Sequence, residues 1–465
     1  MLETMWRTRH QDLIDLISPF VFYATASICA PQQIIDKRRV LDYIRTEFGY
    51  RDISLPVIER VYKRNTTIFE RKQSEYRLIG SLDNAVAEID KRRNECDERL
   101  QVLGNELSEY FSTHLKRGYK YSSDDAVEKL QEFFSRQGAF LGANQLEEHS
   151  SELKGHETDY YIAQFIYEKR DAGAPEYGYV IDLVKGYFLQ SAIYLQAQNG
   201  NVITSTYKNV TFYYDTPFLL KLLNYKAEAD NKDANELHDS LQVQKARFRF
   251  FPQTQREINN ILLAYQRDIG KFSYITLEGL DDKRYTTSDV ERLKATWETG
   301  LSSLYDVKLQ KSPGYKTKAD GTIDEQYIID ENGLRDYLKA NIRWRAEESM
   351  NADVESLINI HQLRGDNFSE EIEHSNSVFV TTNSTLARHF NKYYRENINA
   401  ATFPLVITDS DLAALTWIKC GSTNDLPERQ LLRNAYMATQ PTPEMLEQFS
   451  QVLDRMQSEG KLTEE

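Results

Sequence analysis

In the second half of the chain, runs of β-branched and aromatic residues alternate with stretches of helical periodicity. Residues 210–214 are all of this kind, and Asp215 and the start of an apolar helix follow them directly. Residues 246–252, 377–381 and 403–408 repeat the order, a short strand pattern followed by a helical one. Apolar runs of this length predict buried strands. Strands that alternate with helices predict a central, mostly parallel sheet in a three-layer α/β/α domain.

Residues 1–80 carry helical periodicity followed by a hairpin pattern. Residues 33–48 place apolar side chains at helical spacing, and residues 55–63 predict a second helix. Residues 66–79 predict two short strands around a polar turn. This order is similar to that of a winged-helix domain. The resemblance implies contact with nucleic acid or, as often, with another protein, and the sequence leaves both open.

Residues 81–118 predict one long amphipathic helix. Apolar residues or cysteine recur at every seventh position, and charged residues cover most of the remainder. The repeat falls on Leu82, Ile89, Cys96, Leu103 and Tyr110. Such a helix either packs within its own chain or forms a coiled coil with a second copy or a protein partner. Both alternatives stay open.

Residues 119–204 predict a helical linker region that is rich in tyrosine and phenylalanine. The whole chain has 29 tyrosines, an unusually large number. We expect these rings to form part of a core with their hydroxyl groups at its rim. Stacking of single-stranded bases on them is the alternative.

The 465 residues predict several domains, and the net charge of −14 provides no general attraction for nucleic acid. A nucleic-acid partner would therefore need a local patch. The predicted hairpin region offers one, although two glutamates partly offset it. Its basic residues are Lys63, Arg64, Arg71, Lys72 and Arg77, and the glutamates are Glu70 and Glu75.

The three cysteines are far apart and odd in number, which argues against a disulfide framework or a zinc site. A reducing, cytoplasmic location is the expectation that follows. We expect neither a signal peptide nor a membrane-spanning helix, hence no membrane partner. The most apolar early run, residues 17–30, contains Pro19 and is too short to cross a bilayer.

Acidic side chains follow the predicted strands at the points where helices begin. Asp215 comes directly after the first strand, and Glu257 lies in the first turn predicted for the helix after the second. Asp353 lies near the start of a later helix, and Asn383 follows the strand at 377–381. Ligands of open α/β sheets bind outside the carboxyl ends of the strands, so we expect these side chains to converge. Converging carboxylates stay ionised only around a cation, and oxygen ligands suit Mg²⁺ or Mn²⁺.

On these residues, positions 205–440 resemble a PIN domain, a metal-dependent nuclease fold. The resemblance implies that Asp215, Glu257 and Asp353 are catalytic and hold Mg²⁺ or Mn²⁺, with Asp215 as the central ligand. It implies that Asn383 occupies a fourth catalytic position, where many members carry Asp. It further implies phosphodiester hydrolysis, in RNA rather than DNA, and a prokaryotic toxin or phage-defence setting.

Other residues of this region have two interpretations each. Asp409 and Asp411 either add negative charge to the site or cap the helix that begins there, and capping is the more common role. Four arginines either hold the substrate backbone or pair with acids. They are Arg256, Arg343, Arg345 and Arg364.

Two segments complete the predicted organisation. Residues 265–340 are polar and irregular, and we expect an elaboration between core elements. Residues 441–465 predict a C-terminal helix and a frayed tail. One stripe of that helix would serve for docking, and it comprises Met445, Phe449, Val452 and Met456.

The sequence thus predicts a multidomain α/β endoribonuclease with a winged-helix-like and coiled-coil N-terminal region. Two other functions remain possible on the same residues. One is a binding or assembly protein that keeps the PIN scaffold with weak catalysis, for which Asn383 and the acidic total argue. The other is a nucleic-acid-binding regulator led by the winged-helix-like module.

Overall fold

The computed structural model describes most of the chain between residues 13 and 439, together with Arg455. The gaps in this range are 51–52, 74, 116–119, 138–156, 197–205, 270–276, 282, 316–319, 323–327, 345, 400–401 and 421–424. The predicted docking stripe of Met445, Phe449, Val452 and Met456 lies outside the described residues.

A five-stranded sheet of wholly parallel strands forms the centre of the second half. Its spatial order is β5-β4-β3-β6-β7, so β3, which comes first in sequence among these five strands, lies in the middle of the sheet. This confirms the predicted parallel sheet. The strands are β3 (Thr211–Tyr214), β4 (Arg247–Phe250), β5 (Val307–Leu309), β6 (Ser377–Thr381) and β7 (Val406–Thr408).

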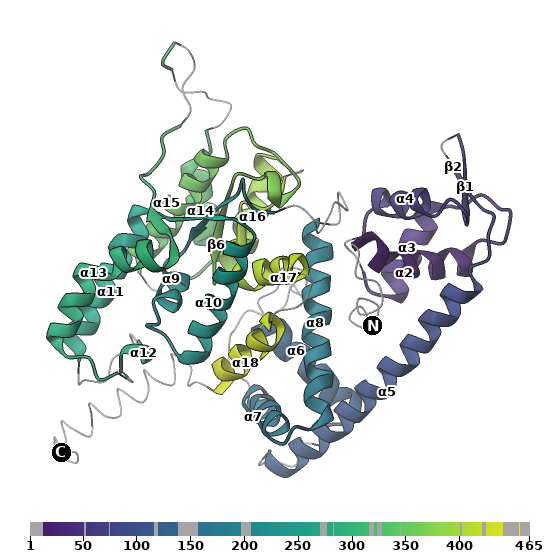
Figure 1. Ribbon diagram of the computed structural model, residues 1–465, viewed down its shortest axis with the longest axis horizontal. Coiled ribbons are helices and arrows are strands. Elements are labelled where there is room, and N and C mark those ends of the chain that lie inside the picture. Colours follow the sequence, from purple (N-terminus) through teal and green to yellow (C-terminus); the bar gives the residue numbers. More distant parts are fainter. Residues whose placement is uncertain are drawn as a thin grey trace.

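Helices connect these strands and follow the last of them (Figure 1). They are α9 (Thr216–Leu222), α10 (Glu228–Val243), α11 (Pro252–Asp268), α12 (Glu278–Asp281), α13 (Thr287–Tyr305), α14 (Glu331–Asn341), α15 (Glu347–Arg364), α16 (Ser384–Asn397), α17 (Asp409–Lys419) and α18 (Leu426–Thr439), with the 3-10 helix η3 (Ile372–His374) before β6.

Alternate residues of the strands enter two different cores. Phe212 and Tyr214 pack with apolar residues of α9, α10, α11 and α17. Tyr213 and Phe379 pack with residues of α14, α15 and α16. Because successive side chains of a strand point to opposite faces, helices cover both faces of the sheet, and the layers are α/β/α.

Residues 265–340 contain more regular structure than the sequence predicted. Helix α13 and strand β5 lie within this range, and β5 pairs with β4 to form one edge of the sheet. The expectation of an irregular elaboration is therefore wrong for this part. Strand β5 has only three residues, of which Val307 alone is buried, so its pattern is too short to detect.

Among its described residues, the N-terminal unit contains three helices followed by an antiparallel hairpin. The hairpin pairs Phe69 with Leu78, and Ile34 forms an isolated antiparallel bridge to Arg77. The predicted helices and hairpin are thus present, with a further helix before them. These elements are α2 (Leu13–Ile28), α3 (Lys37–Glu47), α4 (Leu55–Arg64), β1 (Phe69–Lys72) and β2 (Glu75–Leu78).

One helix, α5 (Asp83–His114), runs from the N-terminal unit toward the second half (Figure 1). Its first part contacts α2, and Ile89 is buried. Its last part buries Leu103, Leu107 and Phe111 against α6 (Ser123–Gln137), α7 (Glu157–Asp171) and α8 (Pro175–Gln196). The long helix predicted at 81–118 is present and packs within its own chain at both ends.

The phenylalanines of α6, α7 and α8 form a core, whereas Tyr160 of α7 is exposed. Phe133, Phe134, Phe165 and Phe188 are all at most 1% exposed. Helix α18 closes this layer, because it packs on α7 and α8 and also contacts α10. In the part of the chain that is described, every helix is too short or too polar to cross a bilayer.

Candidate active site

Asp215 lies at the carboxyl end of the central strand and is only 7% exposed. Its backbone N–H donates to the Val380 carbonyl at 3.0 Å, which continues the β3–β6 ladder by one residue. Since Tyr214 pairs with Val380, Asp215 lies opposite Thr381. The Thr381 hydroxyl accordingly donates to Oδ2 of Asp215 at 2.7 Å. The Thr216 N–H donates to Oδ1 at 2.8 Å, so Asp215 also caps α9.

Glu257 reaches this position from the neighbouring strand. Helix α11 begins at Pro252 directly after β4, which places Glu257 in the second turn rather than in the first turn that the sequence predicted. The Thr216 hydroxyl donates to Oε2 of Glu257 at 2.5 Å. One residue, Thr216, therefore holds carboxylates from two different elements, Asp215 through its N–H and Glu257 through its hydroxyl group.

Asp353 comes from the layer on the other face of the sheet. It lies in the second turn of α15, which begins at Glu347. The indole N–H of Trp344 donates to its Oδ2 at 2.7 Å. Trp344 lies before the first residue of α15, and its side chain reaches Asp353 in the second turn of that helix.

Two side-chain contacts join α11 to α15, one in the interior and one at the surface. In the interior, the Gln253 amide donates to the Ser356 hydroxyl at 2.9 Å, and that hydroxyl donates to the Ala352 carbonyl. At the surface, Arg256 forms a 2.8 Å ion pair with Glu355. Gln253 lies one turn before Glu257, and Ser356 lies one turn after Asp353. These contacts fix the two helices that carry the second and third acids.

The negative charge of Asp215 acts on both Glu257 and Asp353. Burial, followed by the negative charges of Asp215 and Glu257, raises the pKa of Asp353 to about 8, although the Trp344 hydrogen bond opposes this. Burial, with the charge of Asp215, raises the pKa of Glu257 to about 7. The pKa of Asp215 is also raised by burial, although the bonds from Thr381 and Thr216 oppose this.

The donor set fits a hard cation, but the side chains do not form a ready cage. Among the described residues, no lysine or arginine pairs with Asp215 or Asp353, so their negative charge has no positive partner. All the donors are oxygens, which is the choice of Mg²⁺ or Mn²⁺. Within the same described residues, however, no three His, Cys, Asp or Glu side chains approach closely enough to hold a metal ion.

Among the described residues, the hydrogen bond that the Asn383 side chain makes is to a helix start and not to one of the three carboxylates. Asn383 is exposed and caps α16, where its Oδ1 accepts a hydrogen bond of 3.0 Å from the Leu386 N–H. Its backbone N–H donates to the Thr381 hydroxyl at 3.1 Å, and that hydroxyl donates to Asp215. Asn383 therefore supports the site through its backbone, and its amide oxygen is already used by the helix cap.

Asp411 takes part in the cap of helix α17. It stabilises the start of α17, because its Oδ2 accepts from the Thr408 hydroxyl at 2.7 Å and its N–H donates to Thr408 at 3.0 Å. Thr408 is therefore the N-cap of α17, and Asp411 supports this cap from the first turn of the helix.

Asp409 belongs to a buried group of ion pairs behind the site. Its Oδ2 accepts from Lys221 at 3.4 Å and from Arg433 at 3.0 Å, so this oxygen is occupied by two cations. Although burial alone would raise it, these two cations hold the pKa of Asp409 below its usual range. Asp230 and Asp233 of α10 complete the group, and Arg433 contacts both. The charge of Asp409 still reaches Asp215 and raises its pKa.

The four candidate arginines have different surroundings. Arg364 is 1% exposed and donates to the carbonyls of Ser377, Phe403 and Pro404. These carbonyls lie where β6 and β7 begin, at the edge of the sheet opposite the acids, so a substrate contact for Arg364 is wrong. Arg256 pairs with Glu355, and Arg343 is exposed. Arg345 lies outside the described residues.

The strand order explains why the acids meet here. After β3 the chain adds β4 and β5 on one side, then returns to add β6 and β7 on the other. The order therefore reverses between β3 and β6. In open α/β sheets, ligands bind at this reversal point, outside the carboxyl ends of the strands. Asp215 and Thr381 occupy the two strand ends that flank it.

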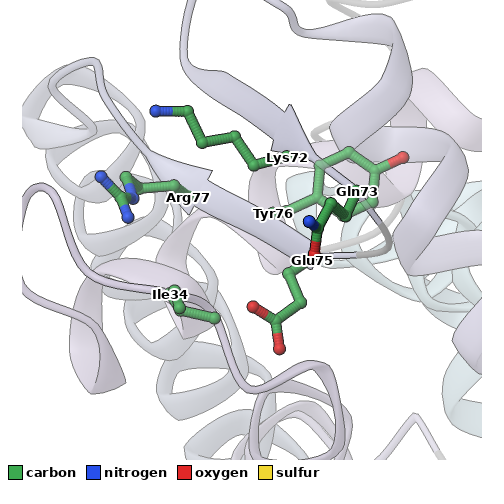
Figure 2. A pocket seen from close by; sticks show the side chains of 6 residues that line it. All are labelled: Ile34, Lys72, Gln73, Glu75, Tyr76 and Arg77. Carbon is green, nitrogen blue, oxygen red and sulfur yellow. The ribbon is translucent and has the colours of Figure 1, made fainter.

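A separate hollow of about 430 Å³ lies in the N-terminal unit, beside the hairpin (Figure 2). Its lining mixes Lys72 and Arg77 with Glu75 and the apolar Ile34. Of the other basic residues in this region, Arg64 pairs with Asp15 and Arg71 lies over the Tyr76 ring. The hollow thus offers no concentrated positive charge.

Three residues of the acidic site were missed by the sequence analysis: Thr216, Thr381 and Trp344. Both threonines lie in the strand-end segments that pointed to the site, so Thr216, directly after Asp215, and Thr381, at the end of the strand 377–381, were available signals. No signal marked Trp344. Neither the protein-family models nor the curated proteins nor the solved structures gave a match to this chain.

Proposed function

We propose that this protein is a metal-dependent endonuclease of the PIN type that hydrolyses phosphodiester bonds in RNA. The observation that carries the proposal is that Thr216 holds both Asp215 and Glu257 at the carboxyl end of the central strand, where the charge of Asp215 also acts on Asp353. Burial, followed by the charges of the neighbouring acids, raises the pKa values of Glu257 and Asp353. Buried acids that repel one another in this way are typical of functional sites.

Each side chain has a role that follows from its contacts. Asp215, Glu257 and Asp353 would hold Mg²⁺ or Mn²⁺. When bound, such an ion supplies positive charge that neutralises these carboxylates and lowers the pKa of a water molecule, as phosphodiester hydrolysis requires. Thr216 and Thr381 orient Asp215, and the Thr216 hydroxyl orients Glu257. Hydrogen bonds of this kind fix ligand direction before a cation arrives.

The test is cleavage of a single-stranded RNA of mixed sequence in the presence of Mn²⁺ or Mg²⁺. Wild type is expected to cut, and Asp215→Asn is expected to be inactive, since it removes the central charge at nearly constant volume. Asp239→Asn is the matched control, because Asp239 is an exposed aspartate of α10. Chelation of the cation should abolish the activity, and equal cleavage by wild type and Asp215→Asn would contradict the proposal. Single-stranded DNA of the same sequence tests the preference for RNA.

A binding or assembly protein on the same scaffold is the second candidate. Two observations favour it: the described acids form no three-ligand cage, and the Asn383 oxygen is committed to a helix cap. Titration with Mn²⁺ separates the two functions. RNA binding without Mn²⁺ binding and without cleavage would support the second candidate.

A further inference from the structure

Trp344 occupies a short connection between two helices that cover the same face of the sheet. Helix α14 ends at Asn341 and α15 begins at Glu347. Ile342, at the start of the connection, is 8% exposed and packs in the core of this layer, and Trp344 is partly buried against the same core. The connection is therefore anchored, and the indole ring is held in place by packing as well as by its hydrogen bond.

The contact between Trp344 and Asp353 leaves the carboxylate with one committed oxygen and one uncommitted oxygen. The 2.7 Å distance from Nε1 to Oδ2 lies at the short end of the range for N–H···O bonds. Within the described residues, Oδ1 of Asp353 has no hydrogen-bond donor. Glu257 shows the same pattern, because Thr216 holds Oε2 and no donor among these residues reaches Oε1. Each of the two acids is thus fixed through one oxygen while the other is left to interact.

We propose that Trp344 is a positioning residue of the acidic site, whose indole N–H fixes Asp353 so that its second oxygen is the one presented to a cation or substrate. This inference rests on the proposed function. Trp344 does not itself touch the reacting atoms in this assignment. A merely structural role, in which Asp353 only satisfies a half-buried indole N–H, is the alternative that the experiment must exclude.

The experiment compares two Trp→Phe variants in the full chain. Trp344→Phe keeps an aromatic ring but removes the donor to Asp353. Trp297→Phe is the matched control, because Trp297 Nε1 also donates to a side-chain oxygen, that of Asn259 at 2.9 Å, and it joins α13 to α11. Both variants lose one Trp–side-chain hydrogen bond, but only the first one loses a bond to a proposed catalytic acid.

Mn²⁺ affinity, measured by calorimetric titration, is the first readout, and cleavage of single-stranded RNA at saturating and limiting Mn²⁺ is the second. Trp344→Phe is expected to weaken Mn²⁺ binding by about 10- to 100-fold, the usual effect of losing a partner of a ligand. Its cleavage should recover in part at high Mn²⁺, and its urea midpoint should match that of Trp297→Phe. Trp297→Phe should bind Mn²⁺ as wild type does.

The outcomes distinguish this inference from the proposed function. Equal Mn²⁺ affinity in wild type and Trp344→Phe would overturn the positioning role while leaving the nuclease proposal intact. A wild type that binds no Mn²⁺ and cuts no RNA would overturn both. An equal loss of affinity in both variants would assign the effect to general destabilisation and would also overturn the positioning role.

Discussion

The Thr216 hydroxyl donates a 2.5 Å hydrogen bond to Glu257, which lies 41 positions further along the chain. Thr216 follows the central strand, and Glu257 lies on the helix after the next strand, so this bond joins two strand–helix units side by side. The backbone N–H of Thr216 simultaneously holds Asp215. Thr216 therefore orients the side chains of both Asp215 and Glu257.

Replacement of Thr216 by valine should remove its hydrogen bond to Glu257 while keeping its hydrogen bond to Asp215. Valine keeps the shape and the N–H to Asp215 but removes the bond to Glu257. We expect Mn²⁺ affinity and RNA cleavage to fall by about 10- to 100-fold, as for other residues that orient ligands. The loss of one buried hydrogen bond should cost only about 1 kcal/mol of stability. Thr216→Ser restores the hydroxyl group and should recover most of the affinity, and failure of this rescue would argue against the orienting bond.

Asp353→Asn should stabilise the protein at alkaline pH. Because the pKa of Asp353 is raised to about 8 in the folded state, the folded form keeps a proton that the unfolded chain loses near its ordinary value of 3.8. The unfolding free energy of wild type should therefore fall as pH rises from about 4 to about 8. Asp353→Asn lacks the ionisable carboxyl group and so does not lose unfolding free energy in this way as the pH rises. Its urea midpoint should therefore exceed that of wild type at pH 8. The expected gain is about 1–2 kcal/mol, as for other relieved functional sites.

The cation provides the control for this prediction. Since Mn²⁺ would bind the ionised acids of the folded form, it should raise the urea midpoint of wild type at pH 8 more than that of Asp353→Asn. A variant that is less stable than wild type across the whole range from pH 5 to pH 8.5 would show that Asp353 is a favourable structural acid instead.

The sequence predicted those parts of the fold that are encoded locally. The apolar run of β3 and the charged residue at its end are adjacent, so the strand and Asp215 could be recognised together. The role of Asp409 could not, because its partners Lys221 and Arg433 come from helices that are distant along the chain. The same holds for Arg364, whose acceptors lie on carbonyl groups that only the folded sheet brings together.

Spacing alone also could not reveal how the acids are held. The pattern placed Glu257 and Asp353 near helix starts, but their approach depends on how α11 and α15 pack, and that packing depends on buried polar contacts. Trp344 shows this most clearly. It contacts Asp353 only because the connection before α15 turns back, and neither an apolar period nor a turn residue marks that path.

The buried contact between Gln253 and Ser356 should prove to be energetically coupled. Ser356→Ala leaves the Gln253 amide, which is 2% exposed, without its 2.9 Å partner. Such an unsatisfied group costs about 1–3 kcal/mol. Gln253→Met in the Ser356→Ala background removes the stranded amide, so the double variant should be more stable than the sum of the single effects by about 0.5–3 kcal/mol.

Urea unfolding of the four proteins gives this coupling energy, and RNA cleavage by the same set tests its relation to the site. If the contact only holds α11 to α15, cleavage should fall in proportion to the change in Mn²⁺ affinity. Strictly additive effects on stability would contradict a direct contact between these two side chains.

His238 should make the protein sensitive to mild acid. It is fully buried beneath the central strand, where Nδ1 lies 3.0 Å from the Tyr214 hydroxyl and Nε2 lies 2.9 Å from the Tyr305 carbonyl. A neutral ring that donates from Nε2 and accepts at Nδ1 satisfies both partners. Burial lowers the pKa of His238 from 6.5 to about 4, although the Tyr305 carbonyl and Asp306 oppose this.

The sign of the effect follows from this depressed pKa. Below pH 6.5 the unfolded chain binds a proton at His238, whereas the folded protein binds it only near pH 4. The contribution of His238 to the unfolding free energy is therefore fully present above pH 6.5 and is lost as the pH falls from 6.5 to about 4. The loss should amount to roughly 3 kcal/mol. In His238→Gln the difference in urea midpoint from wild type should therefore shrink between pH 7 and pH 4. The exposed His374→Gln is the control, and a parallel pH dependence of all three proteins would exclude His238 as the cause.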